Sequence, residues 1–581
     1  MGQAIAWPLV IGSGNDLAQN IRMILSLLIF LPLLGALIVA LLPDSQAVHY
    51  RRIALAVTLA DVVLAGVAYA GFDKTVSGYQ LLEQANWITL PLGNLGVVSI
   101  DYLLGVDGIS LPLVLLSAVV MLVGVVSSWP MTYRQRAYYS LYLLLTGTIM
   151  GCFLALDFFL FFLFFEFMLL PMYFLIGLWG GPRREYASIK FFLYTLLGSL
   201  LILLVMIGLY LSVMDPVSTA VAAGLVTNPS DVTAEVIRAV QVYLQNGQLN
   251  SAQVVHTFDM RYLADGGNYL PNAFLNPSAE PIVAGFPARM LAFWAIFIGF
   301  AIKLPIVPLH TWLPDAHVEA PTPVSVILAG VLLKIGGYGF LRIAWNFFPD
   351  GAAEYAFALA VLGVLSIVYG GLNALAQADL KKMIAYSSVS HMGFVLLGVA
   401  SLTAEGINGA VYQMVSHGVL SSMLFLLVGV VYDRTHDRRI DSYRGLMQSM
   451  PNYTTLTAIA FFGSLGLPGF SGFVGELFTL MGSFQSEWIP GWLTAVATTG
   501  ILLAAAYFLW TLQRMFFGSL WVRPFETKTG SSHTLTDLTA REKLMLIPLG
   551  VMALVLGLFP NLVFDLTNAT VAQWLVKFAV E

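Results

Sequence analysis

Charge is scarce in this chain. Only 10% of the 581 residues are charged, whereas 58% are hydrophobic, and the mean hydropathy is +0.83. A soluble domain carries about 25% charged residues, so this composition excludes an ordinary soluble protein. The net charge of −5 is small and spread along the chain. Because that leaves no basic surface for nucleic acid, we expect no nucleic-acid partner.

Cysteine and cofactor motifs are also nearly absent. A single cysteine, Cys152, excludes an intrachain disulfide and any iron–sulfur cluster or zinc site built from several thiolates. The chain has no G-x-G-x-x-G fingerprint, no Walker A loop and no H-E-x-x-H motif. We therefore expect no cofactor and no metal on this chain. If it serves a redox machine, other subunits hold the electron carriers.

Long apolar runs, in contrast, recur from end to end of the sequence. Each can span the roughly 30 Å hydrocarbon layer of a bilayer. They predict an all-α polytopic membrane protein with about fourteen transmembrane helices. The predicted spans are residues 23–42, 52–72, 109–129, 137–155, 157–178, 189–213, 290–312, 322–343, 355–377, 383–401, 407–432, 454–485, 492–517 and 543–562. Residues 1–22 are expected to be a polar N-terminal lead, because they lack the basic start of a signal peptide.

Basic residues are distributed unevenly between the predicted loops. Loops that follow odd-numbered spans hold eighteen of the 27 Lys and Arg residues, and the opposite side holds seven. The positive-inside rule then places both termini on the outer side of the membrane. We expect a multi-pass protein embedded in the lipid bilayer of a bacterial inner membrane. The two remaining basic residues, Lys303 and Lys334, lie inside predicted spans.

Six titratable residues lie deep inside six different predicted spans: Glu166, Lys303, Lys334, His391, His417 and Glu476. A charge at the bilayer centre costs from about 3 to more than 10 kcal/mol, so such groups face a protein interior or water. For any one of them, the two histidines above all, a buried polar side chain satisfied by a neighbour is the alternative. Together, two carboxylates, two amines and two imidazoles are typical of a proton relay. Since burial and ion pairing shift a pKa in opposite directions, a Glu–Lys contact that forms and breaks can switch a proton.

Two of these spans contain helix-breaking residues. Pro305 and Pro308 follow Lys303, and Pro468 stands among glycines that recur at every third position from 463 to 475. Close helix packing through small residues is one interpretation of the glycines. Beside ionisable residues, the breaks indicate instead discontinuous helices near Lys303 and Gly469, which are tolerated where backbone lines a cavity. Paired broken helices are typical of inverted-repeat transporters.

Other segments carry weaker signals. The longest predicted loop, 214–289, lies on the outer side and includes an expected amphipathic helix at 231–245; we interpret it as a soluble flap or partner-contact loop. The motif HTWLPDAH, with His310, Asp315 and His317, could form a metal site, but a loop at the membrane edge fits it better. The basic run 433–444 is interpreted as a solvated loop, with a docking surface as the alternative.

Five stretches of the sequence carry further information. They are EFMLLPMYFLIGLWGG (166–181), FAIKLPIVPLHTWLPDAHVEAPTPVSVILAGVLLKIGGYGFLR (300–342), DLKKMIAYSSVSHMGF (379–394), QMVSHG (413–418) and GLPGFSGFVGE (466–476). Together they resemble the antiporter-like membrane subunits of respiratory complex I, the proton-translocating NADH:quinone oxidoreductase, and the likeness covers nearly the whole chain from about residue 23. The first stretch and the glutamate at position 476 are similar to those of the subunit M (chain 4) type.

The resemblance implies an architecture of fourteen helices with two inverted five-helix repeats. The implied divisions are the polar lead 1–22, three helices in 23–129, a first repeat in 137–343 containing loop 214–289, a second repeat in 355–517, and a last helix and tail in 543–581. Loop 214–289 and the lead are larger than the family leads us to expect.

The resemblance also implies roles for the buried groups. Glu166 would pair with Lys303 as the input switch, Lys334 would be the central relay, and His391 and His417 would carry the proton on to Glu476 on the exit side. Implied partners are the other membrane subunits of the complex, including neighbouring antiporter-like subunits. FMN, iron–sulfur clusters and quinone would be bound elsewhere in the complex, and quinone reduction there would drive proton movement outward.

Two other functions stay open. A subunit of a multi-subunit Na⁺/H⁺ antiporter or of a membrane-bound hydrogenase would share the same core. A membrane scaffold whose buried charges merely satisfy one another is an alternative of a different class. Reduction of quinone by this chain alone is excluded by the lack of ligands for an electron carrier.

Overall fold

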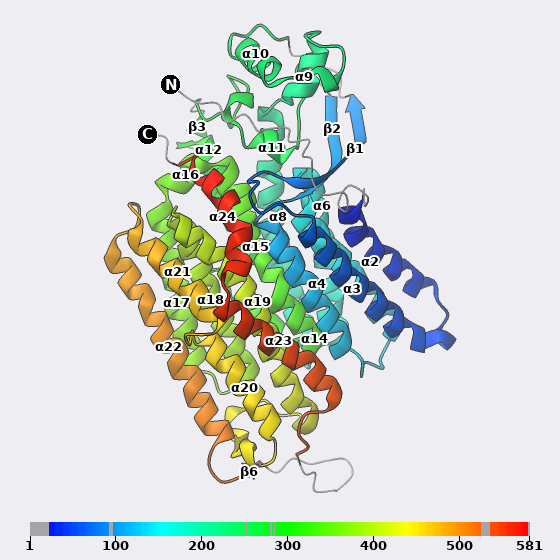
Figure 1. Ribbon diagram of the computed structural model, residues 1–581, viewed down its shortest axis with the longest axis vertical. Helices are drawn as coiled ribbons and strands as arrows, with labels where there is room; N and C mark the ends of the chain where they lie inside the picture. The colour runs from blue at the N-terminus through cyan, green and yellow to red at the C-terminus, as the bar shows by residue number, and fades with distance from the viewer. Residues whose placement is uncertain are drawn as a thin grey trace.

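The computed structural model describes residues 23–91, 97–250, 253–278, 282–283, 285–523 and 535–578. Long helices run side by side through most of the molecule, and smaller elements gather at one end (Figure 1). The helices in the first half are α2 Ile24–Leu41, α3 Ala47–Ala70, α4 Ser110–Ser127, α5 Gln135–Leu154, α6 Phe158–Phe167, α7 Leu169–Trp179, α8 Arg184–Ser212, α9 Pro216–Ala222, α10 Ala234–Gln245, α11 Met260–Leu263, α12 Ala288–Lys303 and α13 Trp312–Glu319. Those that follow are α14 Thr322–Ile327, α15 Leu333–Gly339, α16 Pro349–Glu354, α17 Ala356–Leu375, α18 Leu380–Ala400, α19 Ala404–Thr435, α20 Pro451–Ser464, α21 Ser471–Gln485, α22 Gly491–Phe516, α23 Ala540–Leu558 and α24 Asn561–Leu575.

Helix length gives a lower number of spans than the sequence predicts. Within the described residues, 11 helices are long and apolar enough to cross a membrane, or up to 12 if the bent pair α23–α24 counts as one span. The expected fourteen is therefore not reached by this measure. Two predicted spans remain, 290–312 and 454–485. In each of them a non-helical segment divides the span into shorter helices. The prediction of a polytopic helical membrane protein is confirmed.

Both predicted helix breaks are present. Helix α12 ends at Lys303, and α13 begins only at Trp312, because Pro305 and Pro308 have no backbone N–H to continue the helix. Helix α20 ends at Ser464 and α21 begins at Ser471. Between them Gly466 has φ +79° and Gly469 φ +98°, left-handed values that glycine adopts without the strain of a Cβ.

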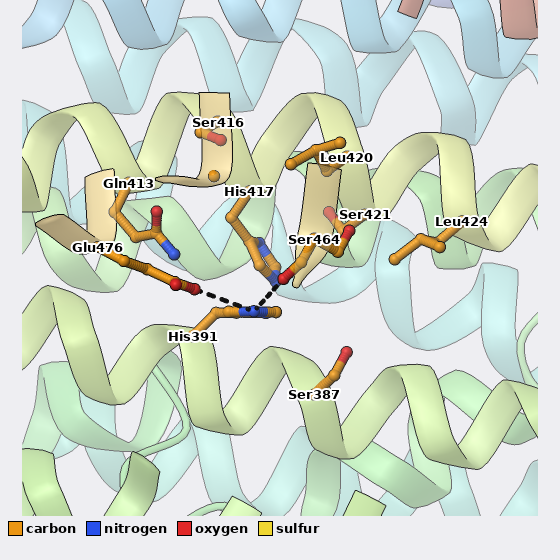
Figure 2. A pocket seen from close by; sticks show the side chains of 11 residues that line it. Ser387, His391, Gln413, Ser416, His417, Leu420, Ser421, Leu424, Ser464 and Glu476 are labelled. Atoms are coloured by element: carbon orange, nitrogen blue, oxygen red, sulfur yellow. Dashed lines mark hydrogen bonds and ion pairs between the residues drawn. The ribbon is translucent and has the colours of Figure 1, made fainter. Parts of the chain in front are cut away.

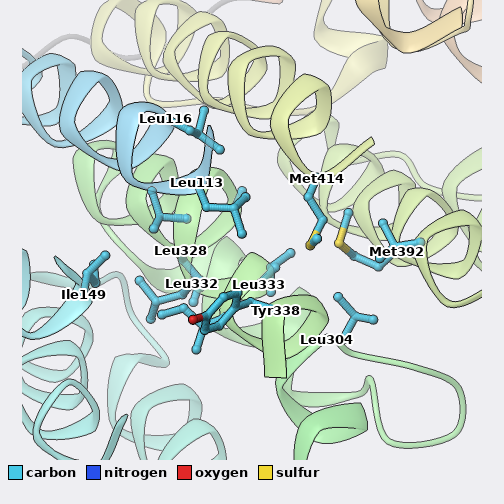
Figure 3. Packing of buried hydrophobic residues seen from close by; sticks show 14 of the residues in the cluster. Leu113, Leu116, Ile149, Leu304, Leu328, Leu332, Leu333, Tyr338, Met392 and Met414 are labelled. Carbon is cyan, nitrogen blue, oxygen red and sulfur yellow. The ribbon is translucent and has the colours of Figure 1, made fainter. Parts of the chain in front are cut away.

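The centre of the bundle is the segment from α14 through α15. Two π-helical turns, η5 Leu328–Leu332 and η6 Phe340–Trp345, flank α15, and every residue from 323 to 348 is buried. Figure 3 shows how apolar side chains surround this segment: Leu113 and Leu116 of α4 on one side, Met392 of α18 and Met414 of α19 on another. Because apolar neighbours pack around it from both halves of the chain, this segment joins the two halves.

One end of the bundle, here called the loop side, carries smaller elements. A β-hairpin that the all-α prediction missed, β1 Gln80–Pro91 with β2 Val97–Val106, lies at this end, as do α9 and α10 (Figure 1). The expected amphipathic helix is confirmed as α10, which Thr233 caps and which buries Val240 and Leu244 on one face. These side chains belong to a small apolar core inside the loop, together with Met214, Ala220, Val232 and Val254.

Both described ends of the chain lie on the loop side. Glu83 in β1 accepts hydrogen bonds from the backbone N–H groups of Leu25 and Ser26 at the start of α2. At the other end, Lys577 donates to the backbone carbonyls of Ala264 and Asn346. The predicted lead 1–22 lies outside the described residues, and the domain divisions remain predictions.

The opposite end, here called the basic side, holds the connections rich in arginine. The Trp179 indole donates to the carbonyl of Tyr133, and Arg438 donates to the carbonyl of Val318. Figure 1 places β6 (Trp521–Val522) at this end, far from β1 and β2. The uneven distribution of charge in the sequence therefore corresponds to two distinct ends of the bundle.

Candidate proton relay

Lys334 lies at the centre of the bundle, on α15. Its side chain is fully buried, and its Nζ donates to the carbonyl of Ala329 in the preceding π turn. The same Nζ is 2.7 Å from Nδ1 of His417 on α19. A predicted relay residue of the first half thus contacts a predicted relay residue of the second half directly.

Three further groups continue from His417. The rings of His417 and His391 lie 5.4 Å apart between centroids. His391 Nε2 is 3.1 Å from the carbonyl oxygen of Ser464 and 3.5 Å from Oε1 of Glu476, as the dashed lines in Figure 2 mark. His391, His417 and Glu476 are buried, with exposed fractions of 6%, 5% and 1%. Four of the six predicted residues therefore form one continuous cluster.

A small polar cavity lies inside this cluster. Its volume is about 10 Å³ for the centre of a water molecule, which is about what a single water requires. Gln413, Ser387 and Ser421 line it together with His391 and Glu476 (Figure 2). Both carboxylate oxygens of Glu476 lack a hydrogen-bond partner in the described protein. A water in this cavity would give the carboxylate a donor and join it to the histidines.

The break between α20 and α21 is what positions Glu476. The turn at Gly466 passes so close that a Cβ there would stand 2.7 Å from Glu476 Oε2. One turn before the carboxylate, Gly472 has no room for a side chain, since a Cβ would meet the carbonyl oxygen of Gly463 at 2.1 Å. The glycines therefore pack α21 tightly and open the backbone beside the carboxylate, so both interpretations of the glycine pattern hold.

Glu166 and Lys303 form a second group. Lys303 Nζ is buried without a hydrogen-bond partner in the described protein and lies 5.0 Å from the ring of Phe165 and 5.8 Å from that of Phe191. Glu166 interacts electrostatically with Lys303 and by a hydrogen bond with Ser199. The two charged groups do not come within the 4.0 Å of an ion pair. The expected pair is thus a pair of neighbours that form no ion pair in this structure, and the amine of Lys303 lies beside the ring of Phe165 instead.

Close backbone packing connects the two groups. At Gly336 on α15, a Cβ would stand 2.6 Å from the backbone nitrogen of Leu304, the first residue after α12. The helix that carries Lys334 therefore packs directly against the break that follows Lys303. The structure shows no direct hydrogen bond between these two lysines in its described part, so the six predicted residues form two groups, Glu166 with Lys303 and the cluster from Lys334 to Glu476.

Two buried residues near the relay are absent from the predicted candidates. His317 is fully buried, neither ring nitrogen has a hydrogen-bond partner in the described protein, and the ring stacks on Phe425 at 4.4 Å. Lys381, a loop cation by the sequence, is buried, and its Nζ lies 2.5 Å from the carbonyl oxygen of Ala320. His317 interacts electrostatically with both Lys381 and Lys334. The motif HTWLPDAH was the only signal for His317, and no signal marked Lys381.

The polar side chains of HTWLPDAH do not converge on one point in the described structure. Asp315 binds Lys190 at 2.8 Å, whereas His310 packs against the ring of Tyr369 at 5.2 Å. No group of three or more potential metal ligands occurs among the described residues. Each polar side chain of this motif therefore has a different neighbour.

The basic run 433–444 is not simply solvated. Arg434 binds Glu542 of α23 through two hydrogen bonds of 2.9 Å each. Arg438 crosses to the end of α13, where it donates to Val318 at 2.7 Å. These arginines hold neighbouring helices together at the basic side, so part of the run is internal structure.

Known proteins share this core. The family model for NADH:quinone oxidoreductase/Mrp antiporter transmembrane proteins matches residues 155–228 and 232–502. NADH-quinone oxidoreductase subunit M of Rhodobacter capsulatus is 40% identical over 554 residues, covering 95% of this chain and 96% of that protein. NAD(P)H-quinone oxidoreductase chain 4 1 of Synechococcus elongatus is 37% identical, covering 94% and 90%.

Solved structures agree. A chain of respiratory complex I from Thermus thermophilus with bound NADH has a TM-score of 0.72 and 29% identity, covering 95% of this chain and 100% of that chain. A chain of the Mrp complex from Dietzia has a TM-score of 0.71 but only 22% identity, covering 96% and 98%, which shows a shared fold alone. By its matched family model and its near full-length relatives, the chain belongs to the NADH:quinone oxidoreductase/Mrp antiporter family of membrane proteins.

Proposed function

We propose that this chain is a proton-translocating membrane-arm subunit of an NADH:quinone oxidoreductase. The observation that carries the proposal is the continuous cluster from Lys334 through His417 and His391 to Glu476, which is buried and lies beside a cavity of water size. Each member can bind or release one proton, and each lies near the next. Near full-length relatives named as subunit M support the assignment to this oxidoreductase.

The relay divides into an input, a centre and an exit. We assign Glu166 and Lys303 to the input, because they are neighbours on α6 and α12 and Lys303 has no hydrogen bond within the described protein to stabilise its charge. Lys334 is the centre. His417 and His391 carry the proton from Lys334 to Glu476, which is the exit-side group.

The membrane orientation of this relay is part of the proposal. We place the basic side in the cytoplasm, since eighteen of the 27 Lys and Arg residues lie in the loops of one side. The loop side, with both described chain ends, then faces the outside of a bacterial inner membrane. Protons move from cytoplasm to outside, driven by quinone reduction elsewhere in the complex.

Other subunits supply the rest of the machine. The chain works beside other membrane subunits, including neighbouring antiporter-like ones, and exposed apolar residues of α2, α8 and α22 provide surfaces for these subunits or for lipid. We place no redox centre on this chain, so that it acts as the translocating part of the enzyme. FMN, iron–sulfur clusters and quinone belong to other subunits of the complex.

Pumping by the assembled complex tests the proposal. Glu166→Gln removes the input carboxylate with little change of shape, and Lys303→Ala removes its partner. In membrane vesicles, each variant is expected to lower NADH-driven proton uptake by about tenfold or more. A tenfold loss corresponds to a barrier raised by about 1.4 kcal/mol. The matched control is Glu185→Gln, an exposed carboxylate at the start of α8. Normal pumping by both relay variants in fully assembled complex would overturn the proposal and favour the scaffold alternative.

An antiporter or hydrogenase subunit is the second candidate, because the matching family description includes Mrp antiporters. Sodium distinguishes the first of these. Vesicles with the wild-type complex are expected to pump protons on NADH at the same rate in potassium and in sodium buffers. A proton gradient discharged by added sodium without NADH would favour an antiporter.

A further inference from the structure

A buried ionic cluster lies between Lys334 and the loop side. Arg342 stands eight residues after Lys334 on the same helical segment, about 12 Å further at 1.5 Å per residue. It belongs to the π turn η6, and its exposed fraction is 0%. By the sequence it is a loop cation, but the structure buries it completely. The proposed relay makes no use of it.

Each of the three nitrogens of the Arg342 guanidinium donates a hydrogen bond. One terminal nitrogen donates to Asp107 Oδ1 at 2.6 Å, and the other donates to the hydroxyl of Tyr79 at 2.8 Å. Nε donates to the hydroxyl of Tyr338 at 3.0 Å. The rings of Tyr79, Tyr338 and Trp574 lie 5.0, 5.2 and 5.6 Å from the guanidinium carbon. The contacts come from α15, α24, the segment before β1 and the residue that follows β2.

Asp107 is the carboxylate partner of Arg342 in this ion pair. Its exposed fraction is 1%, and its Oδ1 also accepts the backbone N–H groups of Ile109 and Ser110 at the start of α4. These two hydrogen bonds hold the carboxylate in place independently of Arg342. The ion pair therefore has a fixed place in the bundle.

Tyr338 stands halfway between Lys334 and Arg342, one helical turn from each. Its hydroxyl donates to the carbonyl of Phe153 at 3.3 Å and accepts from Arg342. A guanidinium has five N–H donors, no acceptor and a pKa above 12, so it cannot take a proton from the tyrosine. Proton transfer along this face of the helix therefore ends at Arg342.

Lys334 itself faces the other way. Its amine contacts the Ala329 carbonyl and His417, which lie toward the basic side and toward the second half. A proton on Lys334 thus has an acceptor in His417. Toward the loop side, Tyr338 and then Arg342 follow on the same helical segment. The charge of Arg342 is compensated by Asp107, so the obstacle to a proton is a guanidinium that donates hydrogen bonds and accepts none.

We propose that Arg342, held by Asp107, Tyr79 and Tyr338, is a barrier that prevents protons on Lys334 from passing directly to the loop side. The barrier directs these protons to the lateral path through His417, so that they do not leak back through the first half. Arginine in a pore is known to exclude protons. The inference rests on the proposed function, because it needs Lys334 to carry protons.

The test measures passive proton permeability. The double variant Arg342→Met with Asp107→Asn removes the charge without leaving a buried carboxylate unpaired, and Asn can still accept the two backbone bonds at α4. Purified complex is reconstituted in liposomes without NADH, and the decay of an imposed pH gradient is followed. We expect the decay to be about tenfold faster than in wild type, which corresponds to a barrier lowered by about 1.4 kcal/mol. Arg342→Lys, which keeps the charge, is expected to stay as tight as wild type.

A triple variant separates a specific path from general damage. Lys334→Met is added to the double variant, and the leak is expected to return to the wild-type rate, because the path runs through Lys334. A leak that persists without Lys334 would mean disordered packing and would overturn the inference. So would a double variant that is as impermeable as wild type. Failure of the proposed function has a different readout, which is normal NADH-driven pumping by Glu166→Gln in complex with wild-type Arg342.

Discussion

The Nζ of Lys334 lies 2.7 Å from Nδ1 of His417, so the two halves of the bundle meet in one hydrogen bond between titratable side chains. Lys334 stands on α15 between two π turns, and His417 stands mid-way along α19, a helix of 32 residues. The π turns alter the helical register around the lysine, which is common at functional sites. In the proposed relay, this contact passes the proton from Lys334 to the second half of the bundle.

Removal of His417 is expected to interrupt the relay at this contact. His417→Ala leaves the buried amine of Lys334 without its side-chain partner, a change worth about 2 kcal/mol, or roughly 30-fold in a rate. We expect NADH-driven proton uptake by vesicles to fall by that order while the complex still assembles. The control is His49→Ala, which changes an exposed histidine in the first turn of α3 and should pump normally. Equal pumping by the two variants would remove His417 from the relay.

Two glycines of the break before α21 provide a matched pair. Gly466→Ala and Gly469→Ala each place a Cβ on left-handed backbone, at a cost of about 1–2 kcal/mol. Only the alanine at 466 also reaches Glu476, at 2.7 Å from Oε2, whereas nothing lies within 4 Å at 469. We expect similar losses of thermal stability but a selective loss of pumping in Gly466→Ala. Pumping reduced equally in both would mean that the break matters only as backbone.

Glu476 is expected to act through its proton rather than its shape. Glu476→Gln keeps the volume of the side chain in the small cavity with His391, and cannot bind and release a proton. Proton pumping should be lost while the melting temperature of the subunit within the complex changes little. The control Glu487→Gln changes an exposed carboxylate in the loop after α21. A pumping Glu476→Gln complex would contradict the exit role.

The proposed orientation is tested by cysteine labelling. Cys152 is fully buried, so the wild-type chain should not react with a membrane-impermeant maleimide. In intact cells, Gln248→Cys on the loop side is expected to react from outside. Glu185→Cys on the basic side should react only after the membrane is opened. The reverse pattern would invert the direction of the proposed relay.

Asp537 gives a pH-dependent contact on the basic side. Burial raises the pKa of Asp537, but hydrogen bonds from Asn452, Leu538 and Tyr453 outweigh it and hold the pKa below its ordinary value of 3.8. A lowered carboxylate pKa stabilises the contact above 3.8, and this stabilisation is lost as the pH falls through the folded value. Hydrogen exchange should therefore show protected amides at Asn452 and Tyr453 at about pH 5 and lose that protection well below about pH 4. Asp537→Asn should remove the pH dependence, and a dependence retained in this variant would point to another group.

The sequence by itself determined the class of the protein and proposed the members of the candidate site. Apolar runs long enough to span a bilayer predicted the long helices, because soluble proteins do not contain so many of them. The prolines after Lys303 and the glycines around Gly469 predicted both broken helices, because backbone geometry depends on local residues. The burial cost of charge at membrane depth selected the six candidate relay residues before any contact between them was known.

Only the tertiary structure decided which of these groups meet. Lys334 and His417 are 83 positions apart, and their contact depends on how α15 packs against α19. Glu166 and Lys303 form no ion pair, and the amine of Lys303 lies beside the ring of Phe165; packing of this kind leaves no periodic signal. Arg342 and Lys381 resemble loop cations in the sequence because they stand near the ends of apolar runs. Their burial follows from distant partners, Asp107 for Arg342 and the Ala320 carbonyl for Lys381, which only the folded chain brings to them.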